Sequence, residues 1–263
     1  MDNEHDQRKP ILVTGAGAGL GAATALEAAK AHHPLILIDR DEAALETIRS
    51  RALSAGAPAV AAQIADVSHE SELVAAIQET VAVVGMPRGT ACFAGIELGG
   101  PSHDIDIDVW DRVMAVNLRG TFLTCRTVIR MLLEQGEPGA IVCVASILAS
   151  VSAGRGTTPY CASKAGVLGL VRSLAVEYAD RGIRVNAISP GPTESELLWA
   201  SVPPSDRERV RGLMEAQVPL GRIATPGEQA RTTLWLLSDQ ASYITGADLN
   251  VDGGVLAQSS FTY

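Results

Sequence analysis

The chain has 263 residues, of which 47% are hydrophobic and 4% aromatic, and its formal net charge is -9. This length and apolar content support one sizeable core of mainly aliphatic side chains, as in a single α/β domain. A negative chain repels nucleic-acid phosphates and anionic lipid, so we expect neither nucleic acid nor a membrane surface as a partner.

The N-terminal segment MDNEHDQRKP is charged and has no apolar stretch, which predicts that a secretory signal is absent and that the protein is cytoplasmic. None of the four cysteines has CxxC spacing, and we interpret them as small buried residues in a reducing compartment. The five histidines form no ligand pattern with them, so the sequence predicts no metal site.

Short apolar runs alternate with longer helical segments along the chain. We expect strands at about 10–15, 34–39, 58–67, 89–95, 140–146, 183–189 and 248–254. Helices are expected at 20–33, at 41–56, at 68–85 with Ser68 as a candidate N-cap, and at 108–135 with a break near 117–120. Two more should follow Pro159 and Thr225, the latter opened by a capping box with Glu228.

This alternation of apolar strands and helices predicts a parallel sheet with helices on both faces, in a single domain over residues 1–263. Residues 190–222 are too many for an ordinary strand-to-helix connection, and we expect them to form a lid over a site. The apolar side chains of this segment suit either a partly apolar substrate or packing between subunits; they are Leu197, Leu198, Trp199 and Met214.

A glycine cluster, TGAGAGLG at 14–21, lies where the first strand meets the first helix. Glycines at such a junction let the backbone approach a pyrophosphate, which then rests on the helix N-terminus. Asp39 ends the next strand, at the spacing of an acid that binds an adenosine ribose. By themselves, the glycines are equally consistent with a tight turn, and Asp39 with a cap on the following helix.

Tyr160 and Lys164 lie four residues apart and share one face of a predicted helix. A free phenol is a poor base at neutral pH, but a nearby ammonium lowers its pKa. Such a pair can move a proton at an alcohol or carbonyl oxygen. A tyrosine and lysine at this spacing usually belong to a solvated helix face, but their place after the glycine cluster and Asp39 favours the catalytic interpretation.

Taken together, these features resemble the short-chain dehydrogenase/reductase (SDR) family, in its branch with roughly 250-residue subunits. The resemblance covers nearly the whole chain and also rests on Asn117-Leu118-Arg119-Gly120, YCASK at 160–164, Asn186 and SYITGADLNVDGG at 242–254. It implies a Rossmann-type doubly wound α/β fold. It also implies an NAD-dependent oxidoreductase that interconverts a secondary alcohol and its ketone.

The resemblance assigns four catalytic residues. Tyr160 would be the general acid/base, and Lys164 would hold the nicotinamide ribose and lower the pKa of the tyrosine. Ser146 would bind the substrate oxygen, and Asn117 would order a water for proton relay. The alternatives are an ordinary strand-end serine for Ser146 and a simple helix kink for Asn117.

The implied cofactor-binding residues include Tyr160 and Lys164, and the others are Gly15, Gly17, Ala18, Gly19, Leu20, Gly21, Asp39, Arg40, Asp66, Val67, Ala94, Gly95, Pro190, Gly191, Thr193 and Ser195. Asp66 would contact the adenine, or else serve as a cap or turn residue. Asp39 favours NAD, since its carboxylate would repel the 2′-phosphate of NADP. Arg40 directly follows it and is the residue that could turn toward such a phosphate.

One position departs from the family pattern. The family usually ends the fourth strand with Asn-Asn-Ala-Gly, whereas this chain has Cys92-Phe93-Ala94-Gly95. Cys92 lacks the hydrogen bonds of the first asparagine, which places local rigidity and cofactor affinity in question but leaves the reacting groups untouched.

Three further expectations complete the sequence analysis. A cofactor-binding scaffold without turnover is the alternative function, although such proteins usually lose the Tyr, Lys or Ser kept here. An enoyl-thioester reductase is disfavoured, because that group places its lysine further from the tyrosine. A homotetramer is expected from the resemblance and from two long apolar helices at about 119–135 and 159–180.

Overall fold

The computed structural model describes residues 8–152, 154, 156–200 and 202–258. Most of the N-terminal segment used to predict the absence of a secretory signal therefore lies outside the described residues. No helix in the described part of the chain combines the length and the apolar character needed to cross a bilayer.

Seven strands form one parallel sheet in the order β3-β2-β1-β4-β5-β6-β7. The strands are β1 (Ile11–Thr14), β2 (Leu35–Asp39), β3 (Val60–Ile64), β4 (Gly89–Cys92), β5 (Gly139–Val144), β6 (Ile183–Pro190) and β7 (Asp248–Val251). Each expected strand is present, and the strand order reverses between β1 and β4. This reversal is the topological switch point at which doubly wound folds bind ligands.

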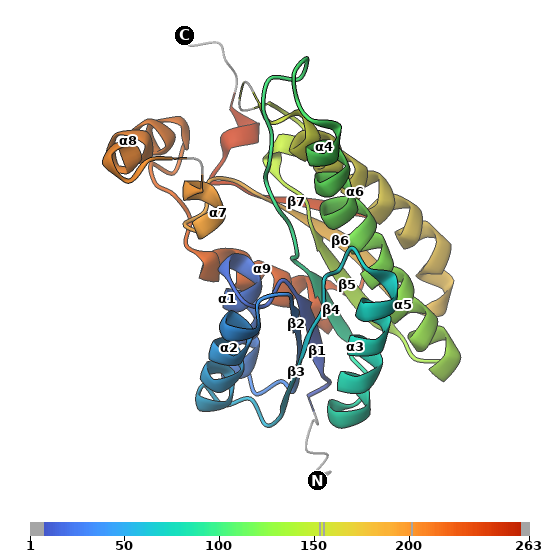
Figure 1. The fold of residues 1–263 in the computed structure, drawn as a ribbon. Coiled ribbons are helices and arrows are strands. Elements are labelled where there is room, and N and C mark those ends of the chain that lie inside the picture. Colours follow the sequence, from blue (N-terminus) through green and yellow to red (C-terminus); the bar gives the residue numbers. More distant parts are fainter. Residues whose placement is uncertain (1–7, 153, 155, 201, 259–263) are drawn as a thin grey trace.

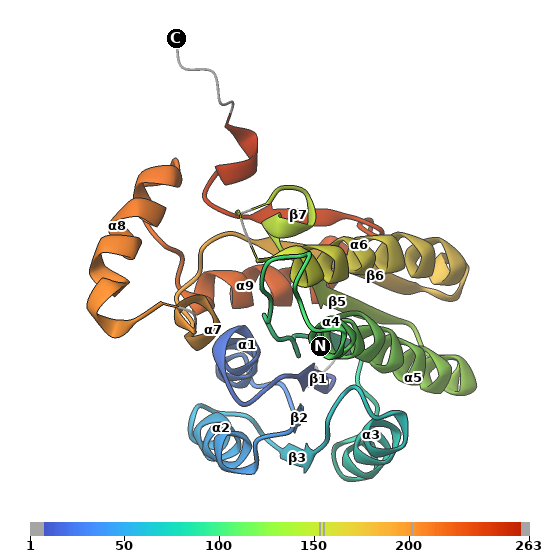
Figure 2. The ribbon, with the colours of Figure 1, turned by 45° about the horizontal axis from the view of Figure 1, so that its top comes forward.

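Helices cover both faces of the sheet, as Figure 2 shows. The helix bounds are α1 (Gly19–Lys30), α2 (Glu42–Ser54), α3 (Glu70–Val84), α4 (Ile107–Met114), α5 (Gly120–Gln135), α6 (Thr158–Tyr178), α7 (Glu196–Trp199), α8 (Arg207–Gln217) and α9 (Pro226–Leu237). The helices α1, α2 and α9 contribute to one buried cluster, and α3, α5 and α6 contribute to the other.

The strands bury both faces because successive apolar side chains point to opposite sides. Leu12, Ile36 and Ile38 lie in the cluster with α3, α5 and α6. Their neighbours Val13 and Leu37 lie in the cluster with α1 and α2. This alternation explains why the strands are apolar throughout rather than at every second residue.

Two local expectations are confirmed and one is wrong. The expected break near 117–120 is a π-helical turn, Ala115–Arg119, between α4 and α5. The capping box of Thr225 and Glu228 opens α9 as expected. Ser68 is not the N-cap of α3, because His69 holds that position and the Ser68 hydroxyl donates instead to Asp66 Oδ1, 2.6 Å away.

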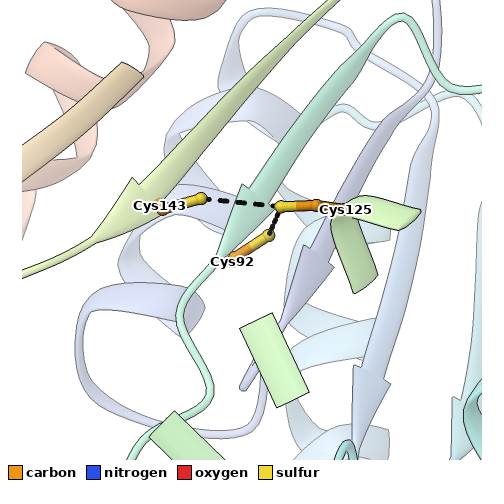
Figure 3. A group of neighbouring side chains, drawn as sticks. All are labelled: Cys92, Cys125 and Cys143. Carbon is orange, nitrogen blue, oxygen red and sulfur yellow. Dashed lines mark hydrogen bonds between the residues drawn. The ribbon is translucent and has the colours of Figure 1, made fainter. Parts of the chain in front are cut away.

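Cys92, at the position where the family has asparagine, packs against two other thiols (Figure 3). Its Sγ lies 4.0 Å from that of Cys125, which lies 3.7 Å from that of Cys143. All three side chains are buried in the cluster formed with α3, α5 and α6. The sulfur atoms are mutually close enough to offer three ligands to an ion. Their apolar surroundings support the interpretation of these cysteines as small core residues.

We predict that Cys92→Ser destabilises the fold by about 1–3 kcal/mol, because it places a hydroxyl among sulfur and aliphatic groups. Chemical denaturation at matched protein concentration measures the change. Cys161→Ser is the control, since Cys161 is only partly buried. Equal stability of the two variants would contradict the view that the thiol cluster is an apolar packing unit.

Candidate active site

A cavity of ≈ 690 Å³ lies at the carboxyl ends of the strands, beside the switch point. It brings together nearly all of the site residues expected from the sequence. Those that line it are Gly15, Ala18, Gly19, Leu20, Gly21, Asp39, Arg40, Asp66, Val67, Ala94, Gly95, Ser146, Tyr160, Lys164, Pro190, Gly191, Thr193 and Ser195. Gly17 and Asn117 are not among the residues that line the cavity.

The glycine loop follows β1 and leads into α1. Gly15 has a positive φ of 69°, and a Cβ there would lie 2.6 Å from the backbone nitrogen of Ala94. A Cβ on Gly21 would lie 2.0 Å from the carbonyl oxygen of Gly15. Side chains are therefore excluded at both positions, and the loop keeps its backbone open at the N-terminus of α1, as an anion-binding turn requires.

Asp39 ends β2 and faces this loop. Its Oδ2 accepts a hydrogen bond from the backbone of Gly17 at 2.8 Å, and its Oδ1 accepts one from Asp41 at 3.0 Å. The N-cap of α2 is Asp41, whose side chain accepts from Ala44. The sequence left open whether Asp39 caps the following helix, and the structure shows that it does not. Its carboxylate is held at the cavity wall instead.

Asp66 follows β3 and is engaged by protein groups. Although burial acts to raise the pKa of its carboxyl, hydrogen bonds from Ser68 and Arg112 lower that pKa to about 2. The Arg112 guanidinium lies 2.7 Å from Oδ2. Asp66 thus both fills the turn role that the sequence left open and lines the cavity.

Asn117 lies in the π-helical turn and is fully buried. Its side-chain amide donates to the Ile96 carbonyl at 2.9 Å and to Ser163 Oγ at 3.0 Å. Its Oδ1 accepts from the Ile96 backbone nitrogen at 2.8 Å. The side chain therefore ties the segment after β4 to α6, which goes beyond a simple kink in the helix.

Tyr160 and Lys164 lie in the first two turns of α6, and both side chains are buried. The Lys164 Nζ lies 5.5 Å from the centre of the Tyr160 ring and donates to the Val144 carbonyl at 2.9 Å. Ser146, two residues beyond the end of β5, is also buried, and its Oγ accepts from the Leu148 backbone. These three side chains meet at one end of the cavity.

Burial dominates the acid–base properties of this pair. It raises the pKa of Tyr160 well above its ordinary value; the Glu97 carboxylate adds to this rise, and the interaction with Ser146 opposes it. Burial lowers the pKa of Lys164 to about 8. The pKa of Tyr160 is therefore raised, and not lowered as the sequence led us to expect, in the protein without a bound ligand. Desolvation disfavours the charged form of each of these two groups.

The segment expected as a lid contains α7 and α8, which lie at the edge of the molecule away from the sheet in both ribbon views (Figures 1 and 2). Leu197, Leu198 and Met214 line the cavity as expected. Trp199 does not line it. The indole is buried, donates to Glu194 Oε1 at 2.7 Å and stacks under Arg211 at 5.0 Å, so it fastens α7 to α8.

Ser195 and Thr193 line the cavity but also serve the backbone. The Ser195 hydroxyl caps α7 by accepting from Leu198. The Thr193 hydroxyl donates to the Gly191 carbonyl at 2.9 Å. Local hydrogen bonds thus fix the positions of both hydroxyls in the segment that follows β6.

Several cavity residues were missed by sequence reasoning; they include Arg112, Ile147, Val210, Leu213, Gln217 and Val255. The sequence did contain a signal for Arg112. This residue lies about one turn before the expected helix break, and its partner Asp66 is the acid at the end of the expected third strand. The residues of α8 and Val255 had none, because the position of α8 beside the cavity depends on tertiary contacts.

Comparisons with known proteins agree with this geometry. A family model described as "Enoyl-(Acyl carrier protein) reductase" matches residues 15–256. The 2-(S)-hydroxypropyl-CoM dehydrogenase 3 of Xanthobacter autotrophicus is 38% identical over 249 residues, covering 94% of this chain and 96% of that protein. The 3beta-hydroxysteroid dehydrogenase 1 of Eggerthella lenta is 38% identical over 257 residues, covering 97% and 96%.

Among solved structures, levodione reductase superposes with a TM-score of 0.88 at 35% identity, covering 95% of this chain and 98% of that one. Matches of this length and identity, together with the parallel sheet, the glycine loop and the Tyr160–Lys164 pair in one cavity, establish the relationship. The chain belongs to the short-chain dehydrogenase/reductase family of oxidoreductases.

Proposed function

We propose that this protein interconverts a secondary alcohol and its ketone with a nicotinamide dinucleotide, using Tyr160 as the general acid/base. The observation that carries the proposal is the convergence of Ser146, Tyr160 and Lys164 in the cavity that the glycine loop and Asp39 also line. A positioned proton donor beside a dinucleotide cradle is what hydride transfer to a carbonyl carbon requires.

The cavity suits a dinucleotide. The glycine loop would hold the pyrophosphate, Asp39 the adenosine ribose and Lys164 the nicotinamide ribose, while Val67, Ala94 and Gly191 would form apolar walls. When bound, the nicotinamide ring supplies or accepts the hydride. We further propose that residues 190–222 act as a lid, since residues of α7 and α8 line the cavity and these two helices lie across the molecule from α6 in Figure 2.

The chain's own residues manage the proton. With its raised pKa, the Tyr160 phenol is protonated at neutral pH and can donate to a ketone oxygen. The Ser146 hydroxyl donates to the same oxygen and stabilises the developing alkoxide. Alcohol oxidation runs the reverse path, in which Tyr160 must first lose its proton; positive charge retained by Lys164 assists that loss.

Two other functions are less well supported. A scaffold without turnover would not require Ser146, Tyr160 and Lys164 to meet in one cavity. The enoyl reductase named by the family model calls for a wider tyrosine-to-lysine spacing than the three intervening residues between Tyr160 and Lys164. A panel of alcohols and ketones, with an enoyl thioester as an additional arm, followed at the absorbance of the reduced nicotinamide, separates these possibilities.

We predict that Tyr160→Phe lowers turnover by about a hundredfold or more while nicotinamide binding stays nearly intact, because only the transferable proton is lost. Steady-state kinetics and calorimetric cofactor titration measure the two effects. Tyr178→Phe, the same change at the other end of α6, is the control. Turnover by Tyr160→Phe close to that of the wild type would refute the assignment.

We propose that the preferred cofactor is NAD. The Asp39 carboxylate is fixed at the cavity wall by two backbone donors and would meet a 2′-phosphate with like charge. Arg40 is exposed and lines the same cavity, so it is the group that could favour NADP. A structural neighbour, an actinorhodin polyketide ketoreductase, was solved with NADPH at 30% identity and a TM-score of 0.88, covering 94% of this chain and 97% of that one.

We predict that the wild type has a higher kcat/KM with NAD than with NADP, and that Asp39→Ala narrows or reverses this ratio, since it removes the repelling charge. Kinetics with both cofactors at one fixed alcohol give the ratio. Asp41→Asn is the control, because Asp41 caps α2 and is not part of the cavity wall. A wild type that prefers NADP, or an Asp39→Ala ratio equal to that of the wild type, would contradict this role.

We also propose a homotetramer. The helices α5 and α6 lie next to each other in both ribbon views, and they expose Phe122, Leu133 and Val176 to solvent. Exposed apolar side chains on neighbouring helices favour a closed symmetric assembly.

We predict that light scattering at micromolar protein concentration gives a mass four times that of the 27.5 kDa chain. Phe122→Glu, which places a charge in the exposed apolar surface, should shift the mass toward smaller species. The control Phe93→Tyr changes a buried aromatic residue outside that surface. A 27.5 kDa particle for the wild type would refute the proposal.

A further inference from the structure

Glu97 is a cavity residue to which the reaction proposed above gives no role. It lies two residues after Gly95, on the irregular segment that leaves β4. The residue before it, Ile96, is bound at both its backbone nitrogen and its carbonyl by the Asn117 amide. The point from which the Glu97 side chain projects is therefore set by a buried anchor, unlike that of an ordinary loop residue.

The carboxylate of Glu97 shares the cavity with the reacting groups. It contributes to the raised pKa of Tyr160. Its own pKa is raised by desolvation and lowered in part by Lys164, while the residue stays exposed to solvent. The geometry agrees, since a Cβ on Gly95, two residues before Glu97, would lie 3.6 Å from Lys164 Nζ, and Glu97, Tyr160 and Lys164 all line the cavity. It makes no hydrogen bond or ion pair with the described residues, so its oxygens remain available within the cavity.

The other carboxylates of the cavity differ from Glu97. Asp39 and Asp66 each accept hydrogen bonds from protein groups, and neither is among the groups that influence Tyr160. Glu196 lies on α7, in the segment proposed as the lid. The lining also contains many aliphatic side chains; they include Leu148, Leu197, Leu198, Leu213 and Met214.

We propose that Glu97 determines substrate specificity by accepting a hydrogen bond from a donor group, a hydroxyl or an amine, on the substrate carbon next to the reacting carbinol. The preferred substrate then combines an apolar body with a vicinal diol or amino alcohol, or the corresponding ketone. A substrate with a carboxylate at that place meets like-charge repulsion. This inference rests on the proposed function, since it presumes that the alcohol binds beside Tyr160.

The test compares three substrates that share one apolar body: 1-phenylethanol, 1-phenyl-1,2-ethanediol and 2-amino-1-phenylethanol. The wild type should favour the two donor-bearing alcohols over 1-phenylethanol by about tenfold or more in kcat/KM, as expected for a site that hydrogen-bonds a substrate group. If only one of the two is favoured, the comparison identifies the donor as a hydroxyl or an amine.

Glu97→Ala should remove this preference, mainly by raising KM for the donor-bearing alcohols, and Glu97→Gln, which keeps one acceptor oxygen but loses the charge, should reduce it. The readout is the ratio of kcat/KM for each donor-bearing alcohol to that for 1-phenylethanol, because any change in Tyr160 acidity affects all three substrates alike. Glu196→Gln, the same change at another cavity carboxylate, should keep the preference. Both the kcat–KM split and the substrate dependence are readouts that a merely structural defect would not produce.

Three outcomes would overturn the inference. One is a wild type that does not distinguish the donor-bearing alcohols from 1-phenylethanol. A second is an equal loss with all three substrates in the Glu97 variants, and a third is the same loss of preference in Glu196→Gln. Absence of turnover with every alcohol and both cofactors, despite measurable cofactor binding, would instead refute the proposed function itself.

Discussion

The site depends on one buried side-chain amide. Asn117 binds both polar groups of the Ile96 backbone and the Ser163 hydroxyl, in a core where unpaired polar groups are costly. A π-helical turn breaks the regular helix at this residue, and such turns are frequent at functional sites. The amide thereby joins the segment that carries Gly95 and Glu97 to the helix that carries Tyr160 and Lys164.

This tie explains the electrostatic character of the cavity. A Cβ on Gly95 would lie 3.5 Å from Asn117 Oδ1 and 3.6 Å from Lys164 Nζ, which shows how closely the two walls approach. Because Tyr160 and Lys164 are buried, desolvation of their charged forms is expensive, and charges interact strongly at such separations. Burial accordingly favours the neutral forms of Tyr160 and Lys164, and the Glu97 carboxylate, which lines the same cavity, makes no hydrogen bond or ion pair with the described residues.

Much of the fold could be predicted from the sequence, because it follows from local patterns. The apolar runs mark every strand, and the break near Asn117 and the Thr225 capping box were recognisable from residue types at short spacings. The N-cap of α3 was misassigned, because Ser68 binds Asp66 rather than the helix. Which group Ser68 binds depends on side-chain geometry, and the spacing of residues in the sequence does not reveal that geometry.

The sequence predicted which residues line the site, but it did not predict their acid–base properties. Motif positions identified the cavity walls, but burial, which reversed the expected effect on the Tyr160 pKa, emerges only from packing around α6. For Trp199 the sequence left open contact with a substrate or packing between subunits, and the residue instead joins α7 to α8 through Glu194 and Arg211. The cytoplasmic location and the absence of nucleic-acid partners remain predictions from charge and composition.

The most direct test of the central claim, that this cavity transfers a hydride between an alcohol and a nicotinamide, is an isotope-tracing measurement. A secondary alcohol deuterated at its carbinol carbon is oxidised by the wild-type protein with NAD, and the reduced cofactor is analysed by mass spectrometry. The account predicts one deuterium on each reduced nicotinamide ring and a slower rate than with the undeuterated alcohol. Ketone formation without transfer of deuterium to the nicotinamide would contradict it.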